Sequence, residues 1–178
     1  AGGGVLLDQG IHMVDLMRLF GGEFTDVKSF ISNSFWGFDV EDNAYAMMRT
    51  DQGVIAMLHS SATQWEHKFT LDMTFEKGSL NLEGILTSTK SYGDETLSVI
   101  WAEKEDIQGN PMKQTTKFNS DYSWQREVDL FAEIITDERQ AIPFADSKDA
   151  LNTMKLVYKI YYNDQKWRQA YNIGDPEK

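Results

Sequence analysis

The amino-acid sequence predicts an α+β fold: a large, predominantly antiparallel open sheet with helices packed on one face. Helix-type patterns occur at both ends of the chain, and strand-type segments joined by short turns fill the middle. Helices do not alternate with strands, and no G-x-G-x-x-G motif occurs. The pattern therefore argues against a dinucleotide-binding βαβ unit within this chain.

Composition indicates one globular domain with a real core, since 41% of the 178 residues are hydrophobic and 12% are aromatic. The net charge of −11 disfavours nucleic acid as a partner, because such a surface repels phosphates. There are no cysteines, which excludes disulfides and thiolate zinc sites and favours a reducing cytoplasm. No apolar run approaches the ~20 residues that span a bilayer, so we expect no membrane segment.

The first helix is expected from near Gln9 to about Phe20. Its apolar residues recur at helical spacing: Met13, Leu16, Met17 and Phe20. Asp8 is a suitable N-cap, and Gly21-Gly22 is a clear stop.

Alternating apolar and polar residues predict a series of strands. They are Val27–Phe35, Asn43–Arg49, Gly53–Ser60, Phe69–Phe75, Ser79–Leu82, Leu86–Tyr92 and Thr96–Trp101. Short turns between them favour hairpins and an antiparallel sheet. The polar stretch from Glu105 to Asn119 is interpreted as a loop with one edge strand.

Two further helices are expected near the C-terminus. The first runs from Trp124 to Ile135, and Pro143 interrupts the chain after it. Asp146 or Ser147 caps the second, which runs to about Asn163. We expect no regular structure from Asn172 onwards.

Asp8 and His12 are the main chemical candidates. If Asp8 caps the helix, His12 lies one turn further on the same side, where a carboxylate can fix the tautomer of an imidazole. This is the arrangement of an acid/base pair. A cap and an exposed helix residue would explain the same spacing. Asp15 could bond the second ring nitrogen of His12, or be a solvated helix residue.

Other candidates rest on weaker signals. Trp36, Trp65 and Tyr122 lie at the ends of predicted elements, where their rings could stack on a sugar or simply pack. The three histidines are His12, His59 and His67, and we expect no metal site from them. Glu41-Asp42 resembles a metal-binding pair only loosely and is interpreted as solvated.

The opening segment carries a family resemblance. Gly2-Gly3-Gly4, Asp8, Gly10, His12 and Asp15 match the pattern G-G-G-x-x-x-D-x-G-x-H-x-x-D. The chain resembles the Gfo/Idh/MocA family of NAD(P)-dependent oxidoreductases. Asn43–Ser60, Glu127–Pro143 and Asp146–Tyr162 are similar to later segments of that family.

The resemblance implies a two-domain parent protein. Residues 1–178 would form a single C-terminal substrate-binding and oligomerisation domain, similar to that of glyceraldehyde-3-phosphate dehydrogenase. An N-terminal Rossmann domain, absent from this chain, would bind most of the NAD or NADP and carry the catalytic lysine of an E-K-P motif. We also expect a homo-oligomer formed through the sheet face.

The resemblance further implies oxidation of a secondary hydroxyl on a sugar, cyclitol or nucleotide sugar. His12 would be the acid/base and Asp8 would hold substrate and histidine, while Gly3 and Gly4 would pack near the nicotinamide. Lys68, Lys90 or Arg126 could meet a diphosphate or lie on the surface. The isolated chain is predicted to be inactive.

Two alternatives remain at this stage. The domain could be a non-catalytic oligomerisation or ligand-binding module of the same fold. It could also belong to an enzyme resembling biliverdin reductase. The pairing of Asp8 with His12 favours the sugar oxidoreductase over the first alternative. Polar site residues with sugar-stacking rings favour it over the second.

Overall fold

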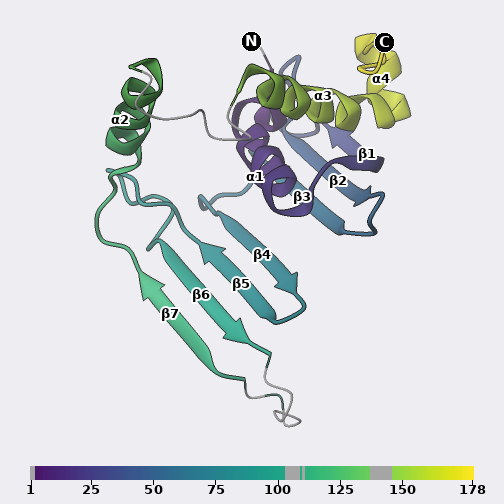
Figure 1. Ribbon diagram of the computed structural model, residues 1–178. Coiled ribbons are helices and arrows are strands. Elements are labelled where there is room, and N and C mark those ends of the chain that lie inside the picture. Colours follow the sequence, from purple (N-terminus) through teal and green to yellow (C-terminus); the bar gives the residue numbers. More distant parts are fainter. Residues whose placement is uncertain (1–2, 103–108, 110, 137–145) are drawn as a thin grey trace. The chain divides into compact units, whose positions relative to one another are not determined.

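The computed structural model describes residues 3–102, 109, 111–136 and 146–178 (Figure 1). These residues form two compact units. The first unit comprises the chain up to Thr63 together with the C-terminal helices, and the second begins at Gln64. Each unit is described by itself.

The first unit is a three-stranded antiparallel sheet with helices on one face. Its elements are the π-helical turn η1 (Leu6–Gly10), α1 (Ile11–Gly21), β1 (Phe24–Ser32), β2 (Asn43–Thr50), β3 (Ile55–Ser61), α3 (Ser147–Asn163) and α4 (Gln165–Tyr171). The strand order is β1-β2-β3. Helix α1 packs against β3 and α3 against β1, and the two helices also pack on each other.

The inner face of this sheet forms the core with α1 and α3. Strand register places Val27 opposite Met48, and Met48 opposite Ala56. Val27 and Met48 are buried together with Leu58 of β3 and with residues of the helical segments: Leu6, Val14, Leu156, Val157 and Ile160. Each fully buried aliphatic side chain contributes roughly 1.5–3 kcal/mol relative to exposure. The alternation of apolar and polar residues predicted from the sequence is therefore explained, because the apolar residues of this face pack against α1 and α3.

The outer face of the same sheet is apolar but exposed. Phe30 pairs with Tyr45 across β1 and β2, and Met47 pairs with Met57 across β2 and β3. Phe30 is 76% exposed and Met57 is 75% exposed. No helix among the described residues of this unit covers these side chains.

The second unit is a four-stranded antiparallel sheet of order β4-β5-β6-β7 followed by a helix. Its elements are β4 (Thr70–Phe75), β5 (Gly78–Glu83), β6 (Thr96–Trp101), β7 (Lys113–Lys117) and α2 (Ser123–Ile135). Leu71, Leu82 and Leu97 lie opposite one another on one face. The same face also carries Met73, Leu80 and Val99, and Phe75 and Trp101 at its end.

The predicted α+β class and antiparallel pairing are confirmed, but the strands among the described residues form two sheets and not one large sheet. The prediction of a strand over Leu86–Tyr92 is wrong. Its hydroxyl groups bond to one another, as Thr89 does to Ser91, and Lys90 adopts a positive φ of 53°. The expected edge strand within Glu105–Asn119 is β7. Pro143 and most of residues 105–110 lie outside the described residues.

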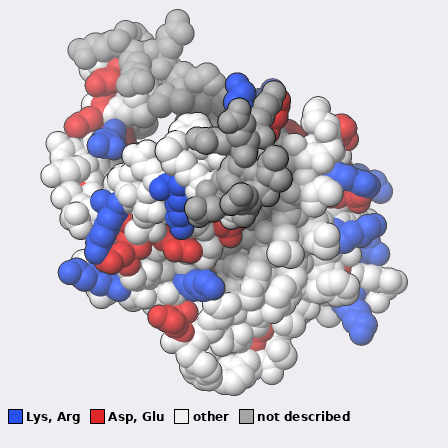
Figure 2. Space-filling model, turned by 90° about the horizontal axis from the view of Figure 1, so that it is seen from below, with Lys and Arg blue, Asp and Glu red and all other residues white. Residues whose placement is uncertain are grey.

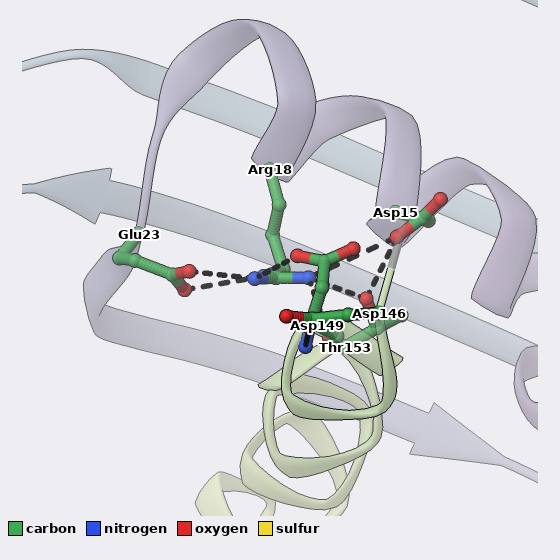
Figure 3. Close-up of polar contacts among 6 residues, drawn as sticks. All are labelled: Asp15, Arg18, Glu23, Asp146, Asp149 and Thr153. Atoms are coloured by element: carbon green, nitrogen blue, oxygen red, sulfur yellow. Dashed lines mark hydrogen bonds and ion pairs between the residues drawn. The ribbon is translucent and has the colours of Figure 1, made fainter. Parts of the chain in front are cut away.

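A buried arginine joins the end of α1 to the start of α3 (Figure 3). The Arg18 side chain is 4% exposed and donates from Nε and Nη2 to the two carboxylate oxygens of Glu23, at 3.1 and 2.6 Å. Its Nη2 also donates to Asp149 Oδ1 at 2.9 Å. The Thr153 hydroxyl accepts from Arg18 Nη1 and donates to Asp15 at 2.8 Å. Paired in this way, the guanidinium can remain charged inside the unit.

Replacing this arginine should destabilise the first unit. We expect Arg18→Met to lower the free energy of unfolding by roughly 2–4 kcal/mol, because Asp149 and Thr153 lose a charged partner. Arg49→Met is the control, since Arg49 and Asp26 form an exposed pair worth less than about 1 kcal/mol. Urea unfolding monitored by circular dichroism measures both. Equal losses in the two variants would contradict the assignment.

The same contact gives stability an acid dependence. The hydrogen bond from Arg18 lowers the pKa of the Glu23 carboxyl below its ordinary value. A depressed carboxyl pKa contributes stability above the unfolded-state pKa, and that stability is lost as pH falls through the folded-state pKa. The decline of stability under acid should therefore be shallower in Arg18→Met than in the wild type.

Candidate functional site

The N-terminal helical segment begins earlier than the sequence predicts. The N–H of Asp8 donates to the carbonyl of Gly4 at 2.9 Å, so Asp8 lies inside the helical segment, in η1. The prediction that Asp8 is an N-cap is therefore wrong. The N–H groups of the first turn are satisfied by Glu41 instead: Val5 donates to its carbonyl at 3.3 Å and Leu6 to its Oε1 at 2.8 Å.

Asp8 and His12 lie on the exposed side of this segment. The buried side is formed by Leu6, Gly10 and Val14, which recur every four residues. Asp8 and His12 have the same spacing but are offset from that row by two residues, and both are exposed. Both side chains are therefore accessible to a ligand on one side of the helix.

Among the described residues, no hydrogen bond or ion pair joins Asp8 to His12. The Asp8 carboxylate accepts from Gln9 Nε2 at 3.0 Å. Asp15 does not bond to His12 either. Its carboxylate accepts from the hydroxyl of Thr153. The carboxylate and the imidazole are thus two separate polar groups, each available to a third molecule.

Gly3 and Gly4 are explained by contacts within the chain. A Cβ on Gly4 would lie 2.3 Å from the carbonyl oxygen of Glu41 and 2.4 Å from its carboxylate. A Cβ on Gly3 would lie 2.5 Å from a methyl group of Leu7. Gly4 therefore allows the first turn to rest directly on Glu41.

Glu41 and Asp42 are buried, at 4% and 2% exposure, so their interpretation as solvated is wrong. Asp42 accepts from the N–H groups of Phe35 at 2.7 Å and Trp36 at 3.3 Å, and from Asn43 Nδ2 at 3.0 Å. Burial alone would raise the pKa of Asp42, but these hydrogen bonds together lower it. The two residues therefore accept from backbone N–H groups: Asp42 from Phe35 and Trp36, and Glu41 from Val5 and Leu6.

Sequence reasoning missed the partners that fix the first turn. The Tyr161 hydroxyl in α3 donates to Glu41 Oε1 at 2.6 Å, and the Ser60 hydroxyl in β3 donates to the carbonyl of Val5 at 3.1 Å. Burial and the neighbouring carboxylate raise the pKa of Tyr161, which keeps it a donor. No local signal marks these residues, because Glu41 and Tyr161 are 120 positions apart.

The three aromatic candidates divide between the units. Trp36 is in the first unit, where its Nε1 donates to the carbonyl of Ala62 at 2.8 Å and its ring meets Phe35 edge-on. Trp65 and Tyr122 are exposed residues of the second unit. The structure therefore places only Trp36 in the same unit as Asp8 and His12.

The histidines do not gather around one point within the first unit. His59 is on the outer face of the sheet, stacked on Tyr45 at 4.3 Å, whereas α1 with His12 packs on the inner face. Burial lowers the pKa of His59. His67 is in the second unit near Tyr92. Among the described residues, no group of three or more His, Asp or Glu side chains could hold a metal ion.

Basic candidates for a diphosphate are exposed residues of the second unit: Lys68, Lys90 and Arg126. On the face drawn in Figure 2, the Lys and Arg side chains of the described residues are dispersed among Asp and Glu. No described helix combines the length and apolar character needed to cross a membrane.

Residues 1–81 match a family model described as GFO/IDH/MocA C-terminal domain. The resemblance to the GFO/IDH/MocA family is confirmed. The matched residues contain η1, α1 and all of the first sheet, and therefore both Asp8 and His12. No curated protein matches the chain.

Solved structures share the fold of this chain. UDP-N-acetylglucosamine 3-dehydrogenase GnnA from Acidithiobacillus ferrooxidans is 18% identical with a TM-score of 0.71, over 93% of this chain and 50% of that one. Levoglucosan dehydrogenase, in complex with NADH and levoglucosan, is 16% identical with a TM-score of 0.68, over 96% and 50%. The WlbA dehydrogenase from Bordetella pertussis, in complex with NADH and UDP-GlcNAcA, is 16% identical with a TM-score of 0.65, over 92% and 43%.

The chain spans about half the length of these structures. Its described strands lie in two antiparallel sheets, and none of them feeds a glycine-rich turn into a crossover helix. These residues do not by themselves fit a dinucleotide. The exposed side of η1 and α1 carries Asp8 and His12.

Proposed function

We propose that this chain is the substrate-binding and oligomerisation half of an NAD(P)-dependent oxidoreductase. The enzyme would act on a secondary hydroxyl of a sugar, cyclitol or nucleotide sugar. The observation that carries the proposal is the exposure of Asp8 and His12 on one side of a firmly held turn in a GFO/IDH/MocA C-terminal domain. NAD or NADP would be bound mainly by an N-terminal Rossmann domain outside this chain.

His12 is proposed to handle the proton of the substrate hydroxyl. Oxidation of a secondary alcohol requires that proton to leave the oxygen, and imidazole is the side chain best suited to exchange protons near neutral pH. His12 is exposed on α1, so a hydroxyl can reach its ring. The Asp8 carboxylate, one turn earlier, can accept from a neighbouring substrate hydroxyl and orient the ring.

Weaker contributions are proposed for other residues. Trp36, Trp65 and Tyr122 have exposed rings that could stack on the apolar face of a sugar. Gly3 and Gly4 would let the nicotinamide end of the cofactor approach the turn. The chain contains no cysteine, which supports a cytoplasmic location.

Removing the imidazole should slow turnover strongly without unfolding the protein. In the full-length protein, we expect His12→Ala to lower kcat roughly 100- to 10,000-fold, the usual contribution of a general acid/base. Cofactor affinity should stay unchanged, and the free energy of unfolding should shift by less than about 0.5 kcal/mol, because His12 is exposed. Steady-state kinetics and calorimetry measure these quantities. Wild-type turnover in His12→Ala would remove this residue from the mechanism.

The isolated chain should be inactive. We expect residues 1–178 alone to show no dehydrogenase activity and to bind NAD and NADP weakly or not at all, since the strands that the structure describes form no βαβ unit. Isothermal titration calorimetry tests this directly. Tight binding of either nucleotide would overturn the proposed division between two domains.

We also propose that a second copy of the chain covers the outer face of the first sheet. That face has Phe30, Tyr45, Met47, Ile55 and Met57 exposed side by side. Contiguous apolar surface of this kind is typical of interfaces. Because neighbouring strands place these side chains on one face of the sheet, two copies can pack face to face.

A charge on this face should dissociate the oligomer. We expect Met57→Lys to raise the dissociation constant at least about tenfold, since a buried ammonium would lack a partner. Gln52→Lys adds the same charge in the exposed turn between β2 and β3 and should have no effect. Sedimentation velocity at tens of micromolar measures both. A monomeric wild type, or equal behaviour of both variants, would contradict this interface.

A further inference from the structure

Glu41 is a buried carboxylate that contacts three parts of the first unit. It immediately precedes Asp42 and β2 and is 4% exposed. Its Oε1 accepts from the Leu6 N–H at 2.8 Å and from the Tyr161 hydroxyl at 2.6 Å. Its own carbonyl accepts from the Val5 N–H at 3.3 Å. A single residue thus joins the start of β2, the first turn and α3.

The first turn is held from a second direction by β3. The Ser60 hydroxyl donates to the carbonyl of Val5 at 3.1 Å. Gly10 packs so closely on this strand that a Cβ there would lie 2.9 Å from the Ser60 hydroxyl oxygen. The backbone on both sides of Asp8 is therefore fixed by tertiary contacts, although the Asp8 side chain itself is exposed.

No space separates the turn from Glu41. A Cβ on Gly4 would collide with both the carbonyl and the carboxylate of Glu41. The carbonyl of Gly4 in turn accepts from the Asp8 N–H at 2.9 Å. The chain of contacts from Glu41 to Asp8 passes through the hydrogen bond from the Leu6 N–H to Glu41 Oε1, the close packing at Gly4 and the backbone hydrogen bond from Asp8 to Gly4. A displacement of Glu41 must therefore move Asp8.

We propose that Glu41 is a positioning residue of the oxidoreductase site: its carboxylate caps the first turn and so sets the place of Asp8, and through the helix that of His12. This rests on the proposed function of those two residues. A carboxylate oxygen suits the task because it can accept from an N–H and an O–H group at the same time. Misplacement of catalytic groups by about 1 Å can cost 100-fold in rate.

The test compares four variants of the full-length protein. Glu41→Ala removes the acceptor, and Glu41→Gln keeps an oxygen that accepts from Leu6. Tyr161→Phe removes one of the two donors and keeps the other. Ser29→Ala is the matched control, because the Ser29 hydroxyl makes a buried bond of 2.6 Å to the carbonyl of Ile160 on the same helix without touching Glu41.

We expect Glu41→Ala to lower kcat roughly 10- to 100-fold with little change in KM for the nucleotide. Glu41→Gln should restore kcat to within about twofold of the wild type, because its amide oxygen still accepts. Tyr161→Phe should give a smaller loss than Glu41→Ala. Ser29→Ala should lower stability as Tyr161→Phe does but leave kcat within about twofold.

Three results would overturn the proposal. Wild-type kcat in Glu41→Ala would show that the cap does not set the site. An equal kcat loss in Ser29→Ala and Tyr161→Phe would reduce Glu41 to a general structural role. A Glu41→Gln variant as slow as Glu41→Ala would mean that charge, and not placement, matters. If Glu41→Ala does not fold, Tyr161→Phe against Ser29→Ala decides the question.

Hydrogen exchange separates this proposal from the proposed function. Amide exchange in the peptide covering residues 3–10 should accelerate in Glu41→Ala but not in Glu41→Gln, whatever the reaction. If His12→Ala is inactive and Glu41→Ala retains full kcat, the positioning role alone fails. If His12→Ala turns over normally while exchange accelerates, the catalytic assignment fails and the cap stands. Unchanged exchange in Glu41→Ala would refute the cap itself.

Discussion

The N-terminal helical segment can present two polar side chains in a constant place only if both of its ends are fixed. Glu41 satisfies the N–H groups at its start, and Arg18 joins its end to α3. Each charged group is nearly inaccessible to water, so each must be fully paired to be tolerated. The exposed side between these two ends carries Asp8 and His12. The buried side chains of Glu41 and Arg18 therefore determine where the exposed side chains of Asp8 and His12 lie.

The inner face of the first sheet is built to receive this segment. Ala44 and Ala46 in the central strand are small and fully buried, which lets the helices approach closely. Two polar residues on this face, Ser29 and Ser60, each donate to a carbonyl of an element packed above them. Hydrophobic packing thus supplies most of the stability, while two hydroxyl groups specify which backbone atoms meet.

Much of the fold could be predicted from local patterns. The hairpin expected over Asn43–Arg49 and Gly53–Ser60 is observed as β2 and β3, and the two later helices begin and end within one residue of expectation. The strand expected at Leu86–Tyr92 does not form, because Thr and Ser side chains can bond locally as well as pair across a sheet. Asp8 failed as a cap for a different reason. Glu41, which lies 35 residues beyond Leu6, accepts from the first turn instead, and no local pattern reveals this contact.

The sequence by itself determined the α+β class, the antiparallel strands and the pair Asp8 and His12 as candidates, because period and spacing are local properties of a chain. Only the tertiary structure decided that the strands divide into two sheets, that Glu41 is a buried cap and that Tyr161 is its partner. Periodicity shows that one face of a helix or strand is apolar, but it does not show which other element packs against that face. Contacts across 35 and 120 residues depend on how the elements pack, and packing is a property of the whole unit.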